Sequence, residues 1–243
     1  LPACSTLKQA KLLEPTWFGL ERIAPRIYVA DDLSPNNRHQ LLASYVEGKR
    51  RVEAFYDGLQ TDPFIYGCGD PACIRSFGGE GDGFAAGTLR PGILLWTKTF
   101  GAGEIAHEWS HLELAARVGR RRMRTVPIWF NEGLATAVGG IPRHAEPVYQ
   151  KALARGYPIP PLAELRTREQ WRDAFTKYPN PEALNVVYAT AGHAVRAWLQ
   201  RVGRPGMRGL IEAIKAGENF DAAFPRIGSQ AVRDPPPVEA QAP

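Results

Sequence analysis

The stretch GEIAHEWSHLELAARVG, residues 103–119, places His107 and His111 four residues apart, with Glu108 directly after the first histidine. In an α-helix, side chains at i and i+4 lie on the same face, so a helix here directs both imidazoles to one side. Apolar residues form two stripes about 200° apart at about 100° per residue, and the two histidines lie in one of them. One stripe consists of Ile105, Trp109, Leu112 and Ala116. The other consists of His107, His111, Leu114 and Val118.

A helix that is apolar on two faces is typical of a buried position. Two buried imidazoles need partners, because an unsatisfied buried polar group is costly. A metal ion satisfies both imidazoles from one side of the helix. Since two histidines alone hold zinc poorly, we expect a third ligand from a neighbouring helix.

The next helical stretch contains a suitable carboxylate. The sequence PIWFNEGLATAVGG, residues 127–140, begins with a proline, which favours a helix start, and surrounds Glu132 with apolar residues. Ionising a carboxylate in such surroundings is unfavourable unless a cation lies opposite. We therefore predict that Glu132 joins His107 and His111 as a metal ligand. Gly133 and the small residues after it are expected to let the two helices approach closely.

The rest of the chain divides into a strand-rich part, residues 20–100, and a helical part, residues 101–228. β-Branched and aromatic residues between Gly and Pro predict four strands, in PRIYVADD (25–32), PFIYGC (63–68), GFAAGTL (83–89) and GILLWTK (92–98). Ser34-Pro35 begins a helix whose apolar face continues to about residue 60. Further helices are predicted at about 103–118, 127–138, 144–155, 168–176, 181–202 and 205–216.

Strands that precede helices in this way indicate the α+β class. We predict a single domain over residues 1–228, followed by a disordered tail, residues 229–243, rich in Pro and Ala. The composition, with 44% hydrophobic and 23% charged residues over 243 residues, is that of a globular protein with a substantial core. No run approaches the roughly 18 apolar residues of a membrane-spanning helix.

The chain is mildly basic, with a formal net charge of +5. Much of this charge lies in RVGRRRMR, residues 117–124, which we interpret as a solvated loop after a helix. Attraction to an anionic surface or an acidic substrate is the alternative. A nucleic-acid-binding module would combine basic residues with aromatic ones or with a reading helix, and neither pattern is present in the sequence, so no nucleic-acid partner is expected.

The three cysteines bear on the compartment. LPAC, residues 1–4, resembles the end of a bacterial lipoprotein signal, in which Cys4 carries the lipid; an ordinary cysteine is the alternative. If Cys4 is lipidated, Cys68 and Cys73 remain as a pair, and an oxidising compartment allows them to form a disulfide. These features predict an exported protein, either a periplasmic or outer-membrane lipoprotein or a secreted one, with a possible membrane attachment through Cys4.

Two motifs of the chain resemble those of the gluzincin metallopeptidases, a group of the peptidase MA-like superfamily. They are HEWSH (107–111) and, further along the chain, WFNEGLA (129–135). VYATAGHAVRAWLQRVG (187–203) is similar to the later gluzincin helix that carries a catalytic tyrosine, so the resemblance covers about residues 84–228. It implies a thermolysin-like catalytic domain with one zinc ion, held by His107, His111 and Glu132.

The same resemblance assigns the catalytic roles. It implies hydrolysis of a peptide or protein substrate, in which Glu108 takes the proton of the attacking water as general base. Tyr188 is expected to donate a hydrogen bond to the oxyanion. His193, five residues later, is a rival for the role of oxyanion donor. The strands at 84–97 are expected to form the sheet edge along which an extended peptide lies.

The sequence departs from the gluzincin pattern at two places. Aminopeptidases of this group bind the substrate amine through an acidic strand motif, whereas GFAAGTLRPG, residues 83–92, contains no acid, although Glu80 and Asp82 lie just before it. We therefore expect an endopeptidase, with an aminopeptidase as the alternative. Thr136 stands where thermolysin has a carboxylate that orients a ligand. A cell-envelope lipoprotein that binds zinc without turnover is a further alternative, which the presence of Glu108 disfavours.

Overall fold

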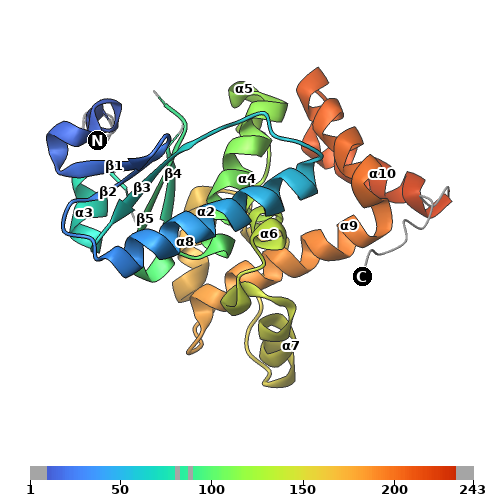
Figure 1. The fold of residues 1–243 in the computed structure, drawn as a ribbon. Helices are drawn as coiled ribbons and strands as arrows, with labels where there is room; N and C mark the ends of the chain where they lie inside the picture. The colour runs from blue at the N-terminus through green and yellow to red at the C-terminus, as the bar shows by residue number, and fades with distance from the viewer. Residues whose placement is uncertain (1–9, 80–82, 87–89, 234–243) are drawn as a thin grey trace. The chain divides into compact units, whose positions relative to one another are not determined.

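The computed structural model describes residues 10–79, 83–86 and 90–233 of the chain. Within this part a five-stranded sheet is formed by the first hundred residues, and the chain after residue 101 is helical (Figure 1). The α+β class expected from the sequence is therefore confirmed. Cys4, Glu80, Asp82 and the predicted tail beyond residue 233 lie outside the described residues.

The sheet has the strand order β1-β2-β3-β5-β4. The three middle strands are parallel, and β1 and β4 run antiparallel at the two ends of this order. All four predicted strands are present, whereas β1 was not predicted, because LERIA mixes charged and apolar residues as an edge strand does. The strands are β1 Leu20–Ala24, β2 Ile27–Ala30, β3 Phe64–Cys68, β4 Gly83–Ala86 and β5 Gly92–Trp96.

The parallel strands are joined by crossover helices, as parallel pairing requires. Helix α2, Pro35–Tyr56, connects β2 to β3, and its first turn is capped by Ser34, whose hydroxyl accepts a hydrogen bond from the Asn37 amide. The helix ends four residues before the predicted limit, because Asp57 adopts a left-handed conformation, with φ of 57°. Helix α3, Pro71–Ser76, lies between β3 and β4 and was not predicted.

The helices predicted after residue 100 are all present, with ends shifted by at most a few residues. The two helices predicted at 181–202 and 205–216 form one element, α9, which is interrupted at Gly203 by a non-helical conformation, with φ of 60°. The elements are α4 Ala102–Val118, α5 Arg120–Met123, α6 Ile128–Gly139, α7 Glu146–Ala154, α8 Arg168–Lys177, α9 Ala183–Ala216 and α10 Phe220–Arg233, with short 3-10 helices η1 Lys11–Leu13, η2 Pro15–Phe18, η3 Thr97–Thr99, η4 Pro142–His144 and η5 Leu162–Glu164.

Two local predictions need correction. The arginine-rich stretch is not a loop throughout, because Gly119, with φ of 86°, ends α4 and residues 120–123 form the one-turn helix α5; its arginines are exposed, as expected. The segment predicted to be disordered from residue 229 begins inside α10, which continues to Arg233.

Contacts within the chain fall into two compact units. The first unit comprises Leu1–Glu113 and Val138–Ile141, and its core lies between the sheet and α2, with Leu41, Val52, Ile65 and Ile93 fully buried. The second comprises Leu114–Ala137 and Pro142–Pro243. Its core contains a cluster of aromatic rings from α6, α9 and α10: Trp129, Phe130, Trp198, Phe220 and Phe224. Of the helices that the structure describes, none has both the length and the hydropathy needed to cross a bilayer.

Cys68 and Cys73 form a disulfide, as predicted, with their Cα atoms 5.6 Å apart. Cys68 is the last residue of β3 and Cys73 lies in the first turn of α3, whose N-cap is Asp70. The Asp70 carboxylate accepts a hydrogen bond of 2.8 Å from the Cys73 amide. The disulfide and the cap together fix α3 to the end of the buried strand.

We expect alkylation without reduction to leave Cys68 and Cys73 unmodified, because both thiols are consumed by the disulfide. Intact-mass measurement before and after reduction should show two additional alkylated thiols after reduction. The double variant Cys68→Ser, Cys73→Ser should lose no more than about 2 kcal/mol of unfolding free energy, since the closed loop is short. Three reactive thiols in unreduced protein isolated from an oxidising compartment contradict the pairing.

Candidate metal centre

Helix α4 is held in the first unit by close packing against α2. A Cβ atom on Gly48 of α2 would lie 2.8 Å from Cγ2 of Ile105, so only glycine permits this approach. One turn further along, the Tyr45 ring stacks on Trp109, with centroids 5.9 Å apart. The Tyr56 hydroxyl lies 2.9 Å from the Ser110 hydroxyl. Ile105 and Trp109 of the predicted apolar stripe are therefore buried against α2. Leu112 is only partly buried and Ala116 is exposed, so the prediction of a buried stripe was wrong for this later part of the helix.

A buried carboxylate provides a further anchor that the sequence analysis missed. Glu113 is fully buried, and its side chain accepts hydrogen bonds from the backbone amides of Gln60 and Thr61 and from the Thr61 hydroxyl. The same hydroxyl accepts a hydrogen bond from the indole of Trp109. These bonds fix the segment after α2 to α4. An isolated acid in the apolar stretch LELAA is the signal that could have indicated a buried, fully paired role.

Helix α6 is fixed in the second unit at its start and along one side. Its first amides, those of Ile128 and Trp129, donate hydrogen bonds of 2.9 Å to the carbonyls of Arg166 and Leu165. These bonds satisfy N–H groups that have no acceptor within the helix itself. The Phe130 ring then packs in the aromatic cluster with Trp198 of α9. These contacts set the rotation of α6 about its axis and thereby the direction of its polar residues.

The glycines of α6 face two different neighbours. We expected Gly133 to allow α6 to approach the histidine helix, but a Cβ atom there would lie 2.4 Å from the carbonyl oxygen of Ala191 in α9. The close approach to α4 occurs at Gly139 instead, where a Cβ atom would lie 2.8 Å from the Gly103 carbonyl and 3.2 Å from Cβ of His107. The prediction for Gly133 was wrong because the rotation of α6 cannot be read from its sequence alone.

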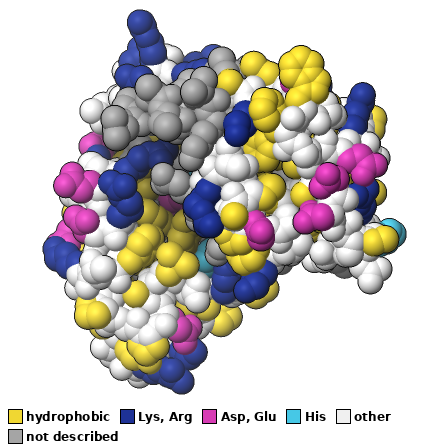
Figure 2. Space-filling model, turned by 90° about the vertical axis from the view of Figure 1, so that its left-hand side faces the viewer, with side chains coloured by type: hydrophobic (Ala, Val, Ile, Leu, Met, Phe, Trp, Pro, Cys, Tyr) yellow, Lys and Arg dark blue, Asp and Glu magenta, His cyan; other side chains and the backbone are white. Residues whose placement is uncertain are grey.

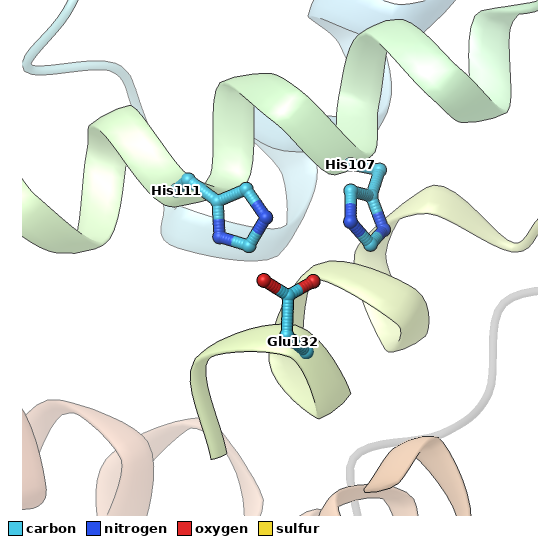
Figure 3. Close-up of side chains that lie close together, drawn as sticks. All are labelled: His107, His111 and Glu132. Atoms are coloured by element: carbon cyan, nitrogen blue, oxygen red, sulfur yellow. The ribbon is translucent and has the colours of Figure 1, made fainter. Parts of the chain in front are cut away.

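The two rows of side chains that start from this contact carry the predicted metal ligands. Gly103, His107 and His111 are spaced four residues apart on α4, and Glu132 precedes Gly139 by two turns on α6, so each set shares one face. The ligand atoms of His107, His111 and Glu132 all lie within 4.8 Å of one another. Figure 3 shows the Glu132 carboxylate directed toward both imidazole rings. These rings lie 4.9 Å apart and nearly perpendicular to one another.

This group of three side chains suits a metal ion. Two imidazole nitrogens and one carboxylate oxygen form a donor set found at catalytic zinc sites, which keep a fourth position open. Ligand atoms about 2.0–2.2 Å from a tetrahedral zinc ion lie roughly 3.3 Å from one another. A spread within 4.8 Å thus requires only small side-chain adjustments. His107 is buried and the other two ligands are partly buried, which limits access of water.

The remaining predicted residues occupy different positions. Glu108 is half-buried on α4, directly after the ligand His107. Tyr188 of α9 is half-buried and contacts two aromatic side chains, His144 and Trp171. Thr136, four residues after Glu132, is buried, and its methyl group lies 2.7 Å from the position of a Cβ atom on Gly192. Thr136 therefore packs α6 against α9.

His193 participates in an ion-pair cluster. Its Nδ1 atom lies 2.8 Å from the Glu146 carboxylate, which also accepts a hydrogen bond of 3.2 Å from Arg196, and its ring stacks on Tyr149. Five residues separate it from Tyr188, which corresponds to about 140° around the helix. The two side chains therefore leave α9 in different directions.

Comparison of the chain with protein-family models, with curated proteins and with solved structures found no match.

We expect Gly139→Ala to destabilise the protein by about 1–3 kcal/mol, the usual range for overpacking, and to weaken zinc binding, because the added methyl group meets the Gly103 backbone. Urea unfolding and zinc titration measure the two effects. Gly209→Ala is the control, since the nearest atom to its Cβ position is 4.0 Å away, and the greater helix propensity of alanine should stabilise it by up to about 1 kcal/mol. Equal zinc affinity in wild type and Gly139→Ala contradicts the role of the glycine contact.

Proposed function

We propose that the protein is a zinc-dependent peptidase with a gluzincin-like catalytic domain. The single observation that carries this proposal is the convergence of His107, His111 and Glu132 from α4 and α6. The three residues follow one another in the sequence as a His-Glu-x-x-His motif and a later glutamate, which is the order of ligands in the gluzincins. Chemically, this set of ligands combines strong zinc affinity with an open coordination position.

The residues beside the ligands suit hydrolysis. Bound zinc contributes Lewis acidity, which polarises a substrate carbonyl and makes water easier to deprotonate. We propose that Glu108, which follows the ligand His107 on α4, takes the proton of the attacking water as general base. Tyr188 donates a hydrogen bond to the oxygen on which negative charge develops.

The sheet offers a place for an extended substrate. Strand β4 is at one end of the strand order and pairs antiparallel with β5 through Gly83–Ala86. A peptide that adds to the free side of such a strand forms main-chain hydrogen bonds independently of its sequence, as a protein-digesting enzyme requires. Residues 83–92 contain no acidic side chain to bind a free amine, which favours an endopeptidase over an aminopeptidase.

The second candidate function is zinc binding without turnover by a cell-envelope lipoprotein. Both candidates place the protein outside the cytoplasm, and the Cys68–Cys73 disulfide supports that location, because such bonds persist in oxidising compartments. Glu108 distinguishes the candidates, since a site that only binds zinc does not need a base. The face drawn in Figure 2 carries Lys and Arg together with Asp and Glu.

We expect about one zinc ion per chain, and we expect it to be lost when His107, His111 or Glu132 is replaced by alanine. Each change removes one of three donors and leaves the others without the ion that satisfies them. Elemental analysis of purified, folded protein measures the zinc content. Full zinc occupancy in Glu132→Ala excludes Glu132 as the third ligand. His193→Ala is the control and should retain zinc.

Glu108→Gln should retain zinc and the wild-type fold but lose nearly all peptidase activity, because an amide cannot accept the proton of the attacking water. Digestion of reduced and alkylated protein substrates, with and without a chelator, measures the activity. Zinc-loaded wild type that cleaves no peptide supports the binding-protein candidate. Equal activity of Glu108→Gln and wild type would instead require another base.

A further inference from the structure

The phenol ring of Tyr188 is held between two aromatic side chains of the second unit. The His144 imidazole lies flat against it, with ring centroids 4.4 Å apart and an angle of 11° between the planes. Trp171 meets the same ring nearly at right angles, at 85° and 5.1 Å. His144 and Trp171 are both almost completely buried. The plane and the rotation of the Tyr188 ring are therefore restrained by two different surfaces.

Both neighbours belong to rigid local structures. His144 is the last residue of η4, a 3-10 turn that begins with Pro142 and is closed by a 3.2 Å bond from the Ala145 amide to the Pro142 carbonyl. Trp171 lies in the first turns of α8, whose start is fixed by a reciprocal capping box between Thr167 and Gln170. Neither ring is carried by a long loop, so each can act as a fixed support.

The face of α9 that carries Tyr188 is directed to the helix of the proposed ligand Glu132. Tyr188 and Gly192 are one turn apart and share a face, and Gly192 contacts the Thr136 methyl group of α6. Thr136 in turn follows Glu132 by one turn on α6. All of these residues lie in the second unit. Tyr188 therefore lies on the side of α9 from which a hydroxyl can serve a site that includes Glu132.

We propose that His144 is a positioning residue, whose flat contact with Tyr188 keeps the phenol hydroxyl in one direction while charge develops on the substrate oxygen. The inference rests on the proposed peptidase function and adds a residue that the ligand motifs do not contain. Hydrogen bonds weaken steeply when they are misaligned. A displacement of about 1 Å at a reacting centre can reduce the rate by up to about 10²-fold. A support for the ring therefore acts mainly on kcat.

The test compares His144→Leu with His144→Phe in the zinc-loaded protein, with an internally quenched peptide chosen from the cleavage sites of the wild type. Leucine removes the flat ring, so kcat should fall about tenfold with little change in KM. Phenylalanine preserves the stacking and should retain kcat within about twofold to threefold. In a Tyr188→Phe background, itself reduced about 10²–10³-fold, His144→Leu should cause no further loss. Equal losses in the two backgrounds overturn the proposal.

A second stack on the same helix provides a matched control. Tyr149 and His193 stack at 4.0 Å and 12°, on a different side of α9 from Tyr188. Tyr149→Leu removes the same kind of contact without changing His193 and should leave kcat unchanged, while the unfolding midpoints of the variants show how much each loses in stability. If Tyr149→Leu lowers kcat as much as His144→Leu does, the effect is general destabilisation and the proposal is wrong.

Fluorine NMR of protein labelled with 3-fluorotyrosine tests the ring restraint independently of turnover. The signal of Tyr188, one of eight tyrosines, is assigned by its loss in Tyr188→Phe. A held ring gives two unequal signals for its two orientations, as expected for wild type and His144→Phe, whereas His144→Leu should give one averaged signal. Averaging in active wild type overturns the restraint and leaves the peptidase function in place. A restrained ring in a protein without turnover overturns both the peptidase function and the catalytic role of His144.

Discussion

The contact between the backbones of α4 and α6 at Gly103 and Gly139 is the constraint on which the candidate metal centre depends. A Cβ atom on either glycine would lie within 3 Å of the carbonyl oxygen of the other. Helices whose contact residues have side chains usually pack 8–10 Å apart, so glycines at the crossing permit a closer approach. The contact places Gly139 beside His107, and Glu132 lies seven residues before Gly139 on the same helix.

Each helix is also held from outside the contact. Tyr45 stacks on Trp109 of α4, and Glu113 binds the segment after α2, while Phe130 fixes α6 in the aromatic cluster. The ligands themselves thus do not need to hold the helices in place. Supports of this kind orient metal ligands before the ion binds, and they make the affinity sensitive to residues that never touch the metal. Pre-arranged ligands also fit a catalytic site, which must keep one coordination position open.

The features that were predictable from the sequence are those that depend on local spacing. The bounds of α4 and the pairing of Cys68 with Cys73 follow from residues close together in the chain. The identification of His107, His111 and Glu132 as candidate metal ligands follows from the pattern of apolar residues along each helix. The rotation of α6 was not predictable, because it depends on the Phe130 cluster and on Ala191, which are distant in sequence. Strand β1 and the buried role of Glu113 depend in the same way on partners that the sequence does not identify.

The two candidate oxyanion donors on α9 illustrate the same limit. Tyr188 and His193 have chemically suitable side chains, and nothing in their order distinguishes them. The helix separates them by about 140°, so only one of them can share the face of Gly192 that meets α6.

The carboxylate that His193 contacts is that of Glu146 in α7. Burial raises the pKa of Glu146, but hydrogen bonds from Gln150, His193 and Arg196 outweigh this effect and hold the pKa below its usual value. A carboxyl with a lowered pKa stabilises the fold above its unfolded-state pKa, and this contribution is lost as the pH falls through the lowered value. His193 therefore helps to fasten α7 to α9.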